Sequence, residues 1–356
     1  MKVIIQIPCL NERETLPQTL ADLPRQIDGI DEIEVLIIDD GSTDGTAERA
    51  KELGVHHIVR FPENRGLAAA FMAGIDAGLR LGADVIVNTD ADNQYPGDRI
   101  GDLVQPILHG EADMVVADRQ TDQIEHFSPI KKLLQRWGSG VVRRLSDTDV
   151  ADSPSGFRAI GRRAALRLFV HNRFTYTLET VIQAGRSGFA VKNVKIETNP
   201  DLRKSRLFKS IPAYLRRAGG VMLRAYAMYR PVQVFAGLAA LLFVAGAASW
   251  LRFLYIYFIS GDSAAGHVQS LVVGTGLLVL AFVLGVAAML GELLAANRRL
   301  LEELLSRVRD LDSRDRTAHR GIASTGVSPW NESPPVSLDA IESEDHETAS
   351  TNVSTT

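Results

Sequence analysis

The sequence predicts an α/β domain with a mostly parallel sheet, followed by interface helices and a hairpin of two membrane-spanning helices. Three observations support this prediction. Apolar runs alternate with amphipathic segments through residues 1–200, as strands and helices do in parallel-sheet proteins. Two long apolar blocks follow at 232–259 and 268–290, separated only by the sequence SGDSAAGH. A stretch rich in Lys and Arg precedes the first block.

Composition narrows the classes of protein to consider. The chain has 356 residues, 46% of them hydrophobic, which is enough for a sizeable core. The formal net charge of −4 gives no broad basic surface, so no nucleic-acid partner is expected. Cys9 is the single cysteine, which excludes an intramolecular disulfide and a zinc site built from several cysteines.

The expected strands are short and rich in β-branched residues. Runs such as VLII and VIVN are apolar throughout, which indicates a sheet that is buried on both faces. The expected strands are 3–7, 34–38, 57–61, 84–88, 114–117 and 190–196. The expected helices between and after them are 14–23, 45–53, 67–81, 129–145, 162–169 and 178–184. Ligands of such sheets bind at the carboxyl ends of the strands.

The two apolar blocks are long enough to cross a bilayer. As helices they would rise about 42 and 35 Å, whereas the hydrocarbon core is about 30 Å thick. The alternative is a pair of core helices in a soluble domain. Eight Lys and Arg residues lie in 203–230, Arg298 and Arg299 follow the second block, and the connecting loop has none. The positive-inside rule then predicts a two-span cell-membrane protein with both termini in the cytoplasm.

The segments around the hairpin have distinct compositions. Residues 201–231 mix apolar side chains with arginines and are expected to lie on the membrane surface. Residues 297–311 are expected to form a juxtamembrane amphipathic helix. Residues 312–356 are polar and rich in Ser, Thr and acids, which is typical of a disordered tail.

An acidic motif directly follows the expected strand 84–88. Asp90, Asp92 and Gln94 carry two carboxylates and an amide oxygen at alternate positions. Hard oxygen ligands of this kind suit Mg²⁺ or Mn²⁺, which often bridge a carboxylate and a substrate diphosphate. The alternative is a solvated acidic loop without a metal, because short motifs often arise by chance.

Two further polar motifs follow the first two expected strands. Asp39 and Asp40 end the second strand and open DDGSTD, where they can accept hydrogen bonds from a ribose or a base. Capping of the next helix would explain the rest of that motif without any ligand. Pro8, Asn11 and Glu12 follow the first strand. No G-x-G-x-x-G follows it, which disfavours a dehydrogenase-type dinucleotide fold.

Taken together, these motifs resemble the inverting family-two glycosyltransferases, which have the Rossmann-like GT-A fold. The resemblance is strongest to the polyprenyl-phosphate sugar transferases, the dolichyl-phosphate mannose synthase group. It spans residues 1 to about 296. The matching segments are IPCLNE (7–12), DDGSTD (39–44), NRGLAAAFMAGI (64–75), DADNQ (90–94), ADR (117–119), SGFRA (155–159) and FTYTLETVIQAG (174–185).

The resemblance implies a role for each matching residue. The expected nucleotide-sugar pocket contains Pro8, Asn11, Glu12, Asp39, Asp40 and Asp90. Asp90, Asp92 and Gln94 are expected to bind the metal and the donor diphosphate, with Asp92 essential for catalysis. Arg119, Arg203 and Arg206 are expected to hold phosphates, although Asp118 stands where the family often has Ser. The segment 155–158 is expected to line the acceptor side.

The implied reaction transfers a hexose from a nucleotide-diphosphate sugar, GDP-mannose or UDP-glucose, to a dolichyl or undecaprenyl phosphate. The expected cofactor is Mg²⁺ or Mn²⁺, and transfer would occur at the cytoplasmic face of the membrane. A phosphate monoester is already a nucleophile near pH 7, so the reaction requires no strong general base.

Two other functions stay open, a membrane polysaccharide synthase and a non-catalytic membrane scaffold of the same fold. Gln135-Arg136-Trp137 is contiguous and precedes SGFR, unlike the Q-x-x-R-W motif of the synthases. The sequence does not decide the sugar, the lipid length or whether the chain forms a homo-oligomer. It also leaves Glu179 open, as a functional acid or as a solvated or capping side chain.

Overall fold

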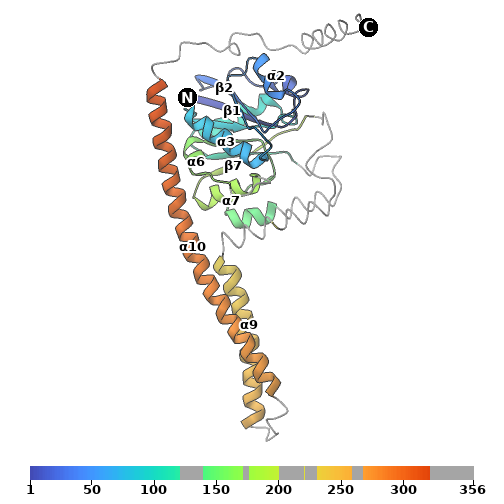
Figure 1. The fold of residues 1–356 in the computed structure, drawn as a ribbon, viewed down its shortest axis with the longest axis vertical. Coiled ribbons are helices and arrows are strands. Elements are labelled where there is room, and N and C mark those ends of the chain that lie inside the picture. Colours follow the sequence, from blue (N-terminus) through green and yellow to red (C-terminus); the bar gives the residue numbers. More distant parts are fainter. Residues whose placement is uncertain (121–138, 171–175, 200–219, 221–230, 259–267, 321–356) are drawn as a thin grey trace, which may run out of the picture. The chain divides into compact units, whose positions relative to one another are not determined.

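In the computed structural model of this chain, the described residues are 1–120, 139–170, 176–199, 220, 231–258 and 268–320 (Figure 1). The side chains of 313–320 are not described. The chain forms two compact units. The first contains Met1–Leu207 together with Leu304–Thr356, and the second is Phe208–Glu303. The expected helix 129–145 lies partly outside the described residues, as does nearly all of the interface region 201–231.

A seven-stranded mixed sheet organises the first unit, in the order β3-β2-β1-β4-β6-β5-β7. β1, β2 and β4 are parallel neighbours, and β5 pairs in parallel with β7. The strands are β1 (Lys2–Cys9), β2 (Glu32–Asp39), β3 (His57–Arg60), β4 (Val85–Asn88), β5 (Met114–Asp118), β6 (Arg158–Gly161) and β7 (Val191–Lys195). All six expected strands are present.

β6 was not expected, because its residues were assigned to an acceptor-side segment. It runs antiparallel between β4 and β5, with Asn88 opposite Arg158. The start of β6 therefore lies at the edge where the parallel strands end. This reversal brings residues just before Arg158 next to those that follow Asn88.

Helices cover both faces of the sheet (Figure 1). Helix α4, which contains Pro106, was not expected. The helices of this unit with described bounds are α1 (Leu16–Ala21), α2 (Thr46–Glu52), α3 (Leu67–Arg80), the short 3₁₀ helix η1 (Gly97–Arg99), α4 (Ile100–Leu108), α6 (Arg162–Arg167) and α7 (Thr177–Arg186). Residues 139–146 are also helical.

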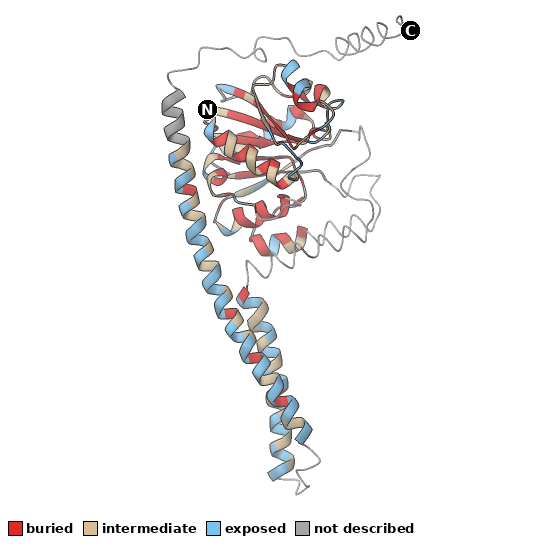
Figure 2. Cartoon of the chain, in the orientation of Figure 1, coloured by how far each residue is buried: buried red, intermediate tan, exposed pale blue. Residues whose placement is uncertain are grey.

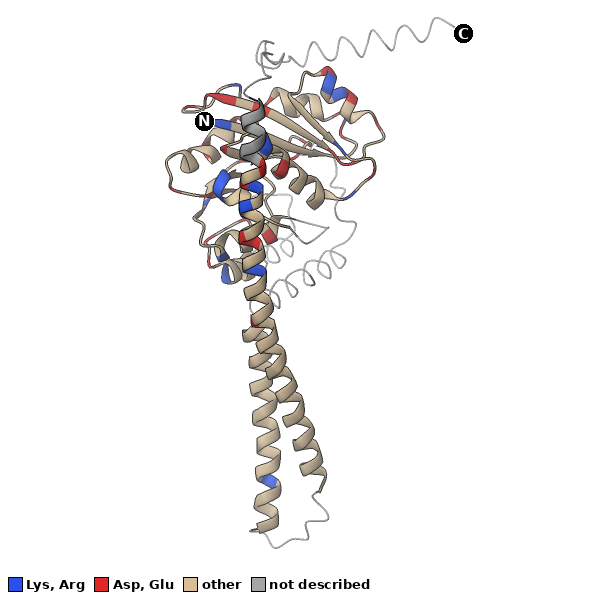
Figure 3. Cartoon of the chain, turned by 60° about the vertical axis from the view of Figure 1, so that its left-hand side comes forward, with Lys and Arg blue, Asp and Glu red and all other residues tan. Residues whose placement is uncertain are grey.

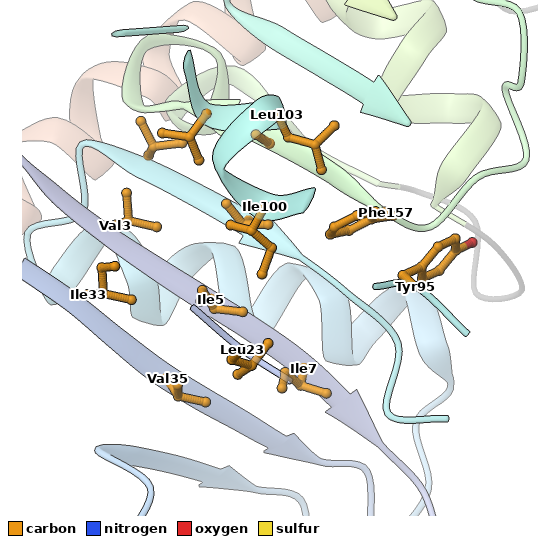
Figure 4. Close-up of a cluster of buried hydrophobic side chains, with 14 of the residues drawn as sticks. Val3, Ile5, Ile7, Leu23, Ile33, Val35, Tyr95, Ile100, Leu103 and Phe157 are labelled. Carbon is orange, nitrogen blue, oxygen red and sulfur yellow. The ribbon is translucent and has the colours of Figure 1, made fainter. Parts of the chain in front are cut away.

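The core lies between the sheet and its helices (Figure 2). Central strand residues such as Ile5 and Ile7 are fully buried, as expected for a sheet with both faces covered. On one face they belong to a cluster with Leu103, Tyr95 and Phe157 (Figure 4). The rings of Tyr95 and Phe157 stack at 5.1 Å, which extends the core to the edge where β4 ends.

The second unit contains α9 (Pro231–Phe258) and the first part of α10 (Val268–Arg320). Both helices are long and apolar enough to cross a membrane, since an 18-residue stretch of each has a mean hydropathy of 2.1 in α9 and 2.6 in α10. Few charged residues lie along these spans (Figure 3). Gly246 lets the helices approach closely, because a Cβ there would be 3.0 Å from the carbonyl oxygen of Gly274. Ser249 also donates a hydrogen bond to the carbonyl of Ser270 (2.8 Å).

Helix α10 continues without a break well beyond its apolar span. The sequence predicted a span at 268–290 and a separate amphipathic helix at 297–311, whereas the structure has one helix to Arg320. Residues from Leu304 onward belong to the first unit. Residues 321–356, which make up most of the expected tail, lie outside the described residues.

Candidate active site

The loops after β1 and β2 are joined by hydrogen bonds. The strands pair in parallel with Cys9 opposite Asp39, so both loops begin at the same place. The backbone N–H of Asn11 donates to Oγ of Ser42 (2.9 Å), and Oδ1 of Asn11 accepts from the N–H of Thr43 (2.9 Å). Asn11 has φ = 55°, a left-handed conformation that asparagine tolerates better than most residues. The first two polar motifs therefore form one rigid surface.

Glu12 and Pro8 are held in the same region. The N–H of Glu12 donates to Oγ1 of Thr46 (3.0 Å), and its carboxylate accepts from the hydroxyl of Thr15 (2.8 Å). Pro8 lies within β1, one residue before its end. Both residues lie where the resemblance expects the nucleotide, and contact with a nucleotide stays a prediction.

The two adjacent acids after β2 have different surroundings. Asp39 is fully buried, where Oδ1 accepts from the N–H of Ser42 (2.8 Å) and Oδ2 lies 3.2 Å from Nε of Arg60. Asp40 instead binds the start of α3. Its two carboxylate oxygens accept from the N–H groups of Arg65 (2.7 Å) and Gly66 (2.9 Å). Arg65 and Gly66 directly precede α3, so Asp40 has a structural role at the entry to this helix in addition to any contact with a nucleotide.

Asp90, Asp92 and Gln94 occupy the turn after β4. The carboxylate of Asp90 lies against Gly156, where a Cβ would come within 3.0 Å of Oδ2 and 3.1 Å of Oδ1. Loss of contact with water, and then the nearby Asp92, raise the pKa of Asp90 to about 7. Two carboxylates that disfavour each other's charge are stabilised by a cation.

The donor atoms in this turn fit Mg²⁺ or Mn²⁺. No group of three or more His, Cys, Asp or Glu suited to a metal occurs within the described ranges. Mg²⁺ does not need such a group, since it often binds through one or two carboxylates together with substrate phosphates. Asp90, Asp92 and the amide of Gln94 could supply the protein oxygens.

A buried polar network lies behind this turn. Asn88, at the end of β4, donates to the carbonyl of Gly156 (2.9 Å) and to the hydroxyl of Tyr176 (2.8 Å). Gln6 donates to Oδ1 of Asn88 (2.8 Å). The N–H of Gly156 donates to the hydroxyl of Tyr95 (3.1 Å). These bonds hold Gly156 against Asp90.

Arg119 makes a two-point ion pair with Asp152. Its Nε lies 2.6 Å from Oδ2 and its Nη2 lies 3.0 Å from Oδ1. The charge of Arg119 partly opposes the rise in the pKa of Asp90, so the two groups interact electrostatically. Sequence reasoning missed Asp152, and its position three residues before the SGFR segment was the available signal.

The side chain of Arg158 has a structural role. Its side chain is fully buried, and it donates to the carbonyl of Thr177 (3.1 Å) and to Oγ1 of Thr180 (2.6 Å). It also donates to the carbonyl of Ser155. Arg158 thus ties β6 to α7 and offers no exposed group to an acceptor. Glu179, in the first turn of α7, is only 7% exposed, so it is not a solvated acid.

Arg203 and Arg206 lie outside the described residues. The chain that leads to them is bound to the acidic turn through Asn199. Its backbone N–H donates to the carbonyl of Gln94 (3.0 Å), and its side-chain amide donates to the carbonyl of Asn93 (3.0 Å). Sequence reasoning also missed Asn199, which lies four residues before Arg203.

The chain is similar in sequence to a known enzyme family and to several proteins of other organisms. The model of glycosyl transferase family 2 matches residues 4–169. An uncharacterised protein of Methanocaldococcus jannaschii is 31% identical over 202 residues, which cover 55% of this chain and 81% of that protein. The polyprenol monophosphomannose synthase of Mycolicibacterium smegmatis is 27% identical over 206 residues, covering 55% of this chain and 76% of the synthase.

A solved structure supports the fold. Glucosyl-3-phosphoglycerate synthase from Mycobacterium tuberculosis, in complex with phosphoglyceric acid, aligns with a TM-score of 0.51 and 23% identity. The alignment covers 63% of this chain and 79% of the synthase. This likeness confirms the GT-A type of sheet expected from the sequence.

Proposed function

Because the chain belongs to glycosyl transferase family 2, we propose that it transfers a hexose from a nucleotide-diphosphate sugar to a polyprenyl phosphate at the cytoplasmic face of the membrane. The observation that supports this most strongly is the position of the acidic turn. Asp90 and Asp92 follow β4, beside the edge where the joined loops of β1 and β2 begin. The polyprenol monophosphomannose synthase is a relative with a lipid acceptor, and two candidate spans would bring this chain to such a lipid.

The donor is expected to lie across the ends of β1, β2 and β4. The loops that carry Asn11, Glu12 and Asp39 would hold the nucleoside, and GDP-mannose and UDP-glucose are both retained as donors. A divalent cation bound by Asp90, Asp92 and Gln94 would neutralise charge on the leaving diphosphate. Attack from the opposite face of the sugar inverts its anomeric centre.

The acceptor is expected to supply its own nucleophile. A phosphate monoester is mostly dianionic at pH 7, so no residue has to remove a proton from it. Both carboxylate oxygens of Asp152 already accept from Arg119. Asp152 therefore suits the positioning of Arg119, whose remaining N–H groups could bind a phosphate.

The test is a transfer assay with the full chain in nanodiscs. Radiolabelled GDP-mannose, UDP-glucose and UDP-N-acetylglucosamine are each incubated with undecaprenyl or dolichyl phosphate and Mn²⁺. We expect one of the donors to transfer its radiolabelled sugar to the lipid fraction. No label should appear there when a chelator removes Mn²⁺. Label in a growing soluble glycan would instead support a polysaccharide synthase. No transfer from any donor, in protein shown to be folded, would leave the scaffold alternative.

Substitution of the basic stretch separates acceptor from donor. Arg203→Ala and Arg206→Ala each remove a charge-assisted hydrogen bond, so catalytic efficiency for the lipid phosphate should fall roughly ten- to a hundredfold. Donor affinity, measured by calorimetry with the metal, should change little. Arg99→Ala removes an exposed charge from the same unit and is the matched control. Weakened donor binding would assign these arginines to the diphosphate.

A further inference from the structure

The part of α10 beyond its apolar span contacts the domain of the sheet through its polar side. Residues 304–312, called the docking segment here, belong to the same compact unit as the sheet. Three ion pairs join this segment to α3 and α6: Arg309 with Asp76 (3.0 Å), Asp312 with Arg80 (3.0 Å) and Asp310 with Arg162 (3.6 Å). The leucine and valine side chains at 304, 308 and 311 are 58–68% exposed.

Arg309 makes the most extensive of these contacts. Its Nη2 lies 3.0 Å from Oδ1 of Asp76 on α3, and its Nη1 donates to the carbonyl of Leu168 (2.6 Å). Leu168 is the residue that closes α6. Carbonyls at the end of a helix have no partner within the helix, and a cation stabilises that end. One guanidinium therefore connects α10 to two helices of the domain.

Burial makes this contact more than a surface ion pair. The side chain of Arg309 is 13% exposed, and Ser306 one turn earlier is 8% exposed. Burial raises the pKa of Asp76, while the charge of Arg309 opposes that rise. Exposed ion pairs contribute little to stability, but removal of one partner from a desolvated pair leaves the other without compensation.

We propose that α3 and α6 form a docking surface for residues 304–312 of α10, and that Arg309 is the residue that locks this contact. The proposal does not depend on the donor, the metal or the acceptor. Helix α3 is also the one whose preceding residues, Arg65 and Gly66, donate to Asp40. The docking segment contacts the C-terminal half of α3, and Asp40 holds the residues just before its N-terminus. Together these contacts would fix the position of α3.

Hydrogen exchange of the full chain in nanodiscs tests the role of Arg309. Arg309→Ala should speed amide exchange in α6, in the second half of α3 and in the docking segment, by roughly tenfold because a buried bond network is lost. Arg299→Ala removes the same charge from an exposed position of α10, where the arginine pairs with Glu292 of the same helix, so it should change exchange in α3 and α6 little. Equal exchange in Arg309→Ala and the wild type would overturn the proposal.

A conservative variant separates docking from a general loss of charge. Arg309→Lys keeps the positive charge but has no planar fork, so it should not bond Asp76 and the Leu168 carbonyl together as arginine does. We expect intermediate exchange for Arg309→Lys. Exchange identical to that of the wild type would show that the two-point contact is not what locks the segment.

Cross-linking tests the contact itself without altering Arg309. Cysteines replace Arg80 and Asp312, whose side chains pair at 3.0 Å, and membranes are treated with a short bis-maleimide. An intramolecular product should form in the double variant, and neither single variant should give it. This experiment also decides the proposal if Arg309→Ala does not fold. No intramolecular product in the double variant would overturn the docking surface.

Discussion

Gly156→Ala should weaken metal binding without altering any predicted metal ligand. An ideal Cβ at Gly156 would lie 3.0 and 3.1 Å from the carboxylate oxygens of Asp90, and 3.1 Å from the hydroxyl of Tyr176. Ordinary contact begins at 3.4 Å, so the carboxylate must move by up to about 0.4 Å. Gly156 does not have a positive φ, so the effect should come from the methyl group and not from backbone strain.

The size of that movement sets the expected loss. Ligand distances in metal sites are held to about 0.2 Å, and Mg²⁺ tolerates departures from its geometry poorly. Residues that orient metal ligands change affinity by about ten- to a hundredfold when altered, and we expect a loss in that range. Mn²⁺ affinity is measured by electron paramagnetic resonance with nucleoside diphosphate present.

Gly161→Ala is the matched control. It lies in β6, five residues after Gly156, and is also crowded, with Ile107 at 3.2 Å and the carbonyl of Asp113 at 3.3 Å, but no carboxylate of the acidic turn lies within 4 Å. It should lower thermal stability at most and leave Mn²⁺ affinity unchanged. Affinity of Gly156→Ala within twofold of the wild type would refute the reasoning. Loss of affinity in both variants would attribute the effect to general disruption.

Three further predictions address the metal, the topology and the acid stability. Asp92→Ala should abolish nearly all sugar transfer while the protein stays folded. Asp98→Ala, at an exposed aspartate, is the control. Full turnover by Asp92→Ala would contradict the metal assignment. A cysteine at Ser263 should react with an impermeant thiol reagent outside intact cells, whereas a cysteine at Ser343 should not, and the opposite labelling would reverse the topology. Burial lowers the pKa of His56 to about 4, and its Nδ1 accepts from the N–H of Val35. The unfolded chain therefore binds more protons between about pH 6.5 and 4, so stability should fall as pH falls through that window. Thermal unfolding of His56→Gln should be less sensitive to pH there; equal sensitivity would exclude His56 as the cause.

Strands β2, β4 and β5 could be predicted because each contains a continuous apolar run. β6 could not, since it has four residues and begins with an arginine. Arg158 is tolerated in the interior only because carbonyls and a hydroxyl from distant residues surround it. A local pattern contains no sign of such partners.

The length of α10 was also misjudged from local pattern. The sequence was divided where hydrophobicity ends, near Glu292 and Arg298. No Gly or Pro occurs between 292 and 320, so nothing in the chain stops the helix. A change in polarity marks the end of a membrane span, but a helix ends only where its backbone is interrupted.

The candidate site was predicted where it depends on strand ends. Parallel strands bring their carboxyl ends together, which accounts for the proximity of the first two motifs. The structural role of Asp40 depends on Arg65 and Gly66, and the restraint on Arg119 depends on Asp152. These partners lie at least 25 residues away along the chain, so only the fold reveals them.

The reversed direction of β6 also bears on how acceptor preference could diverge within this fold. The chain leaves the sheet at Arg119 and re-enters at Arg158, and both points lie at the edge that carries the acidic turn. The connection therefore starts and finishes beside the candidate active site. Doubling the length of such a connection adds only about 0.6 kcal/mol of closure entropy. Evolution or a protein engineer could exchange the part of this connection before Asp152 while Asp152, Gly156 and every strand pairing are retained.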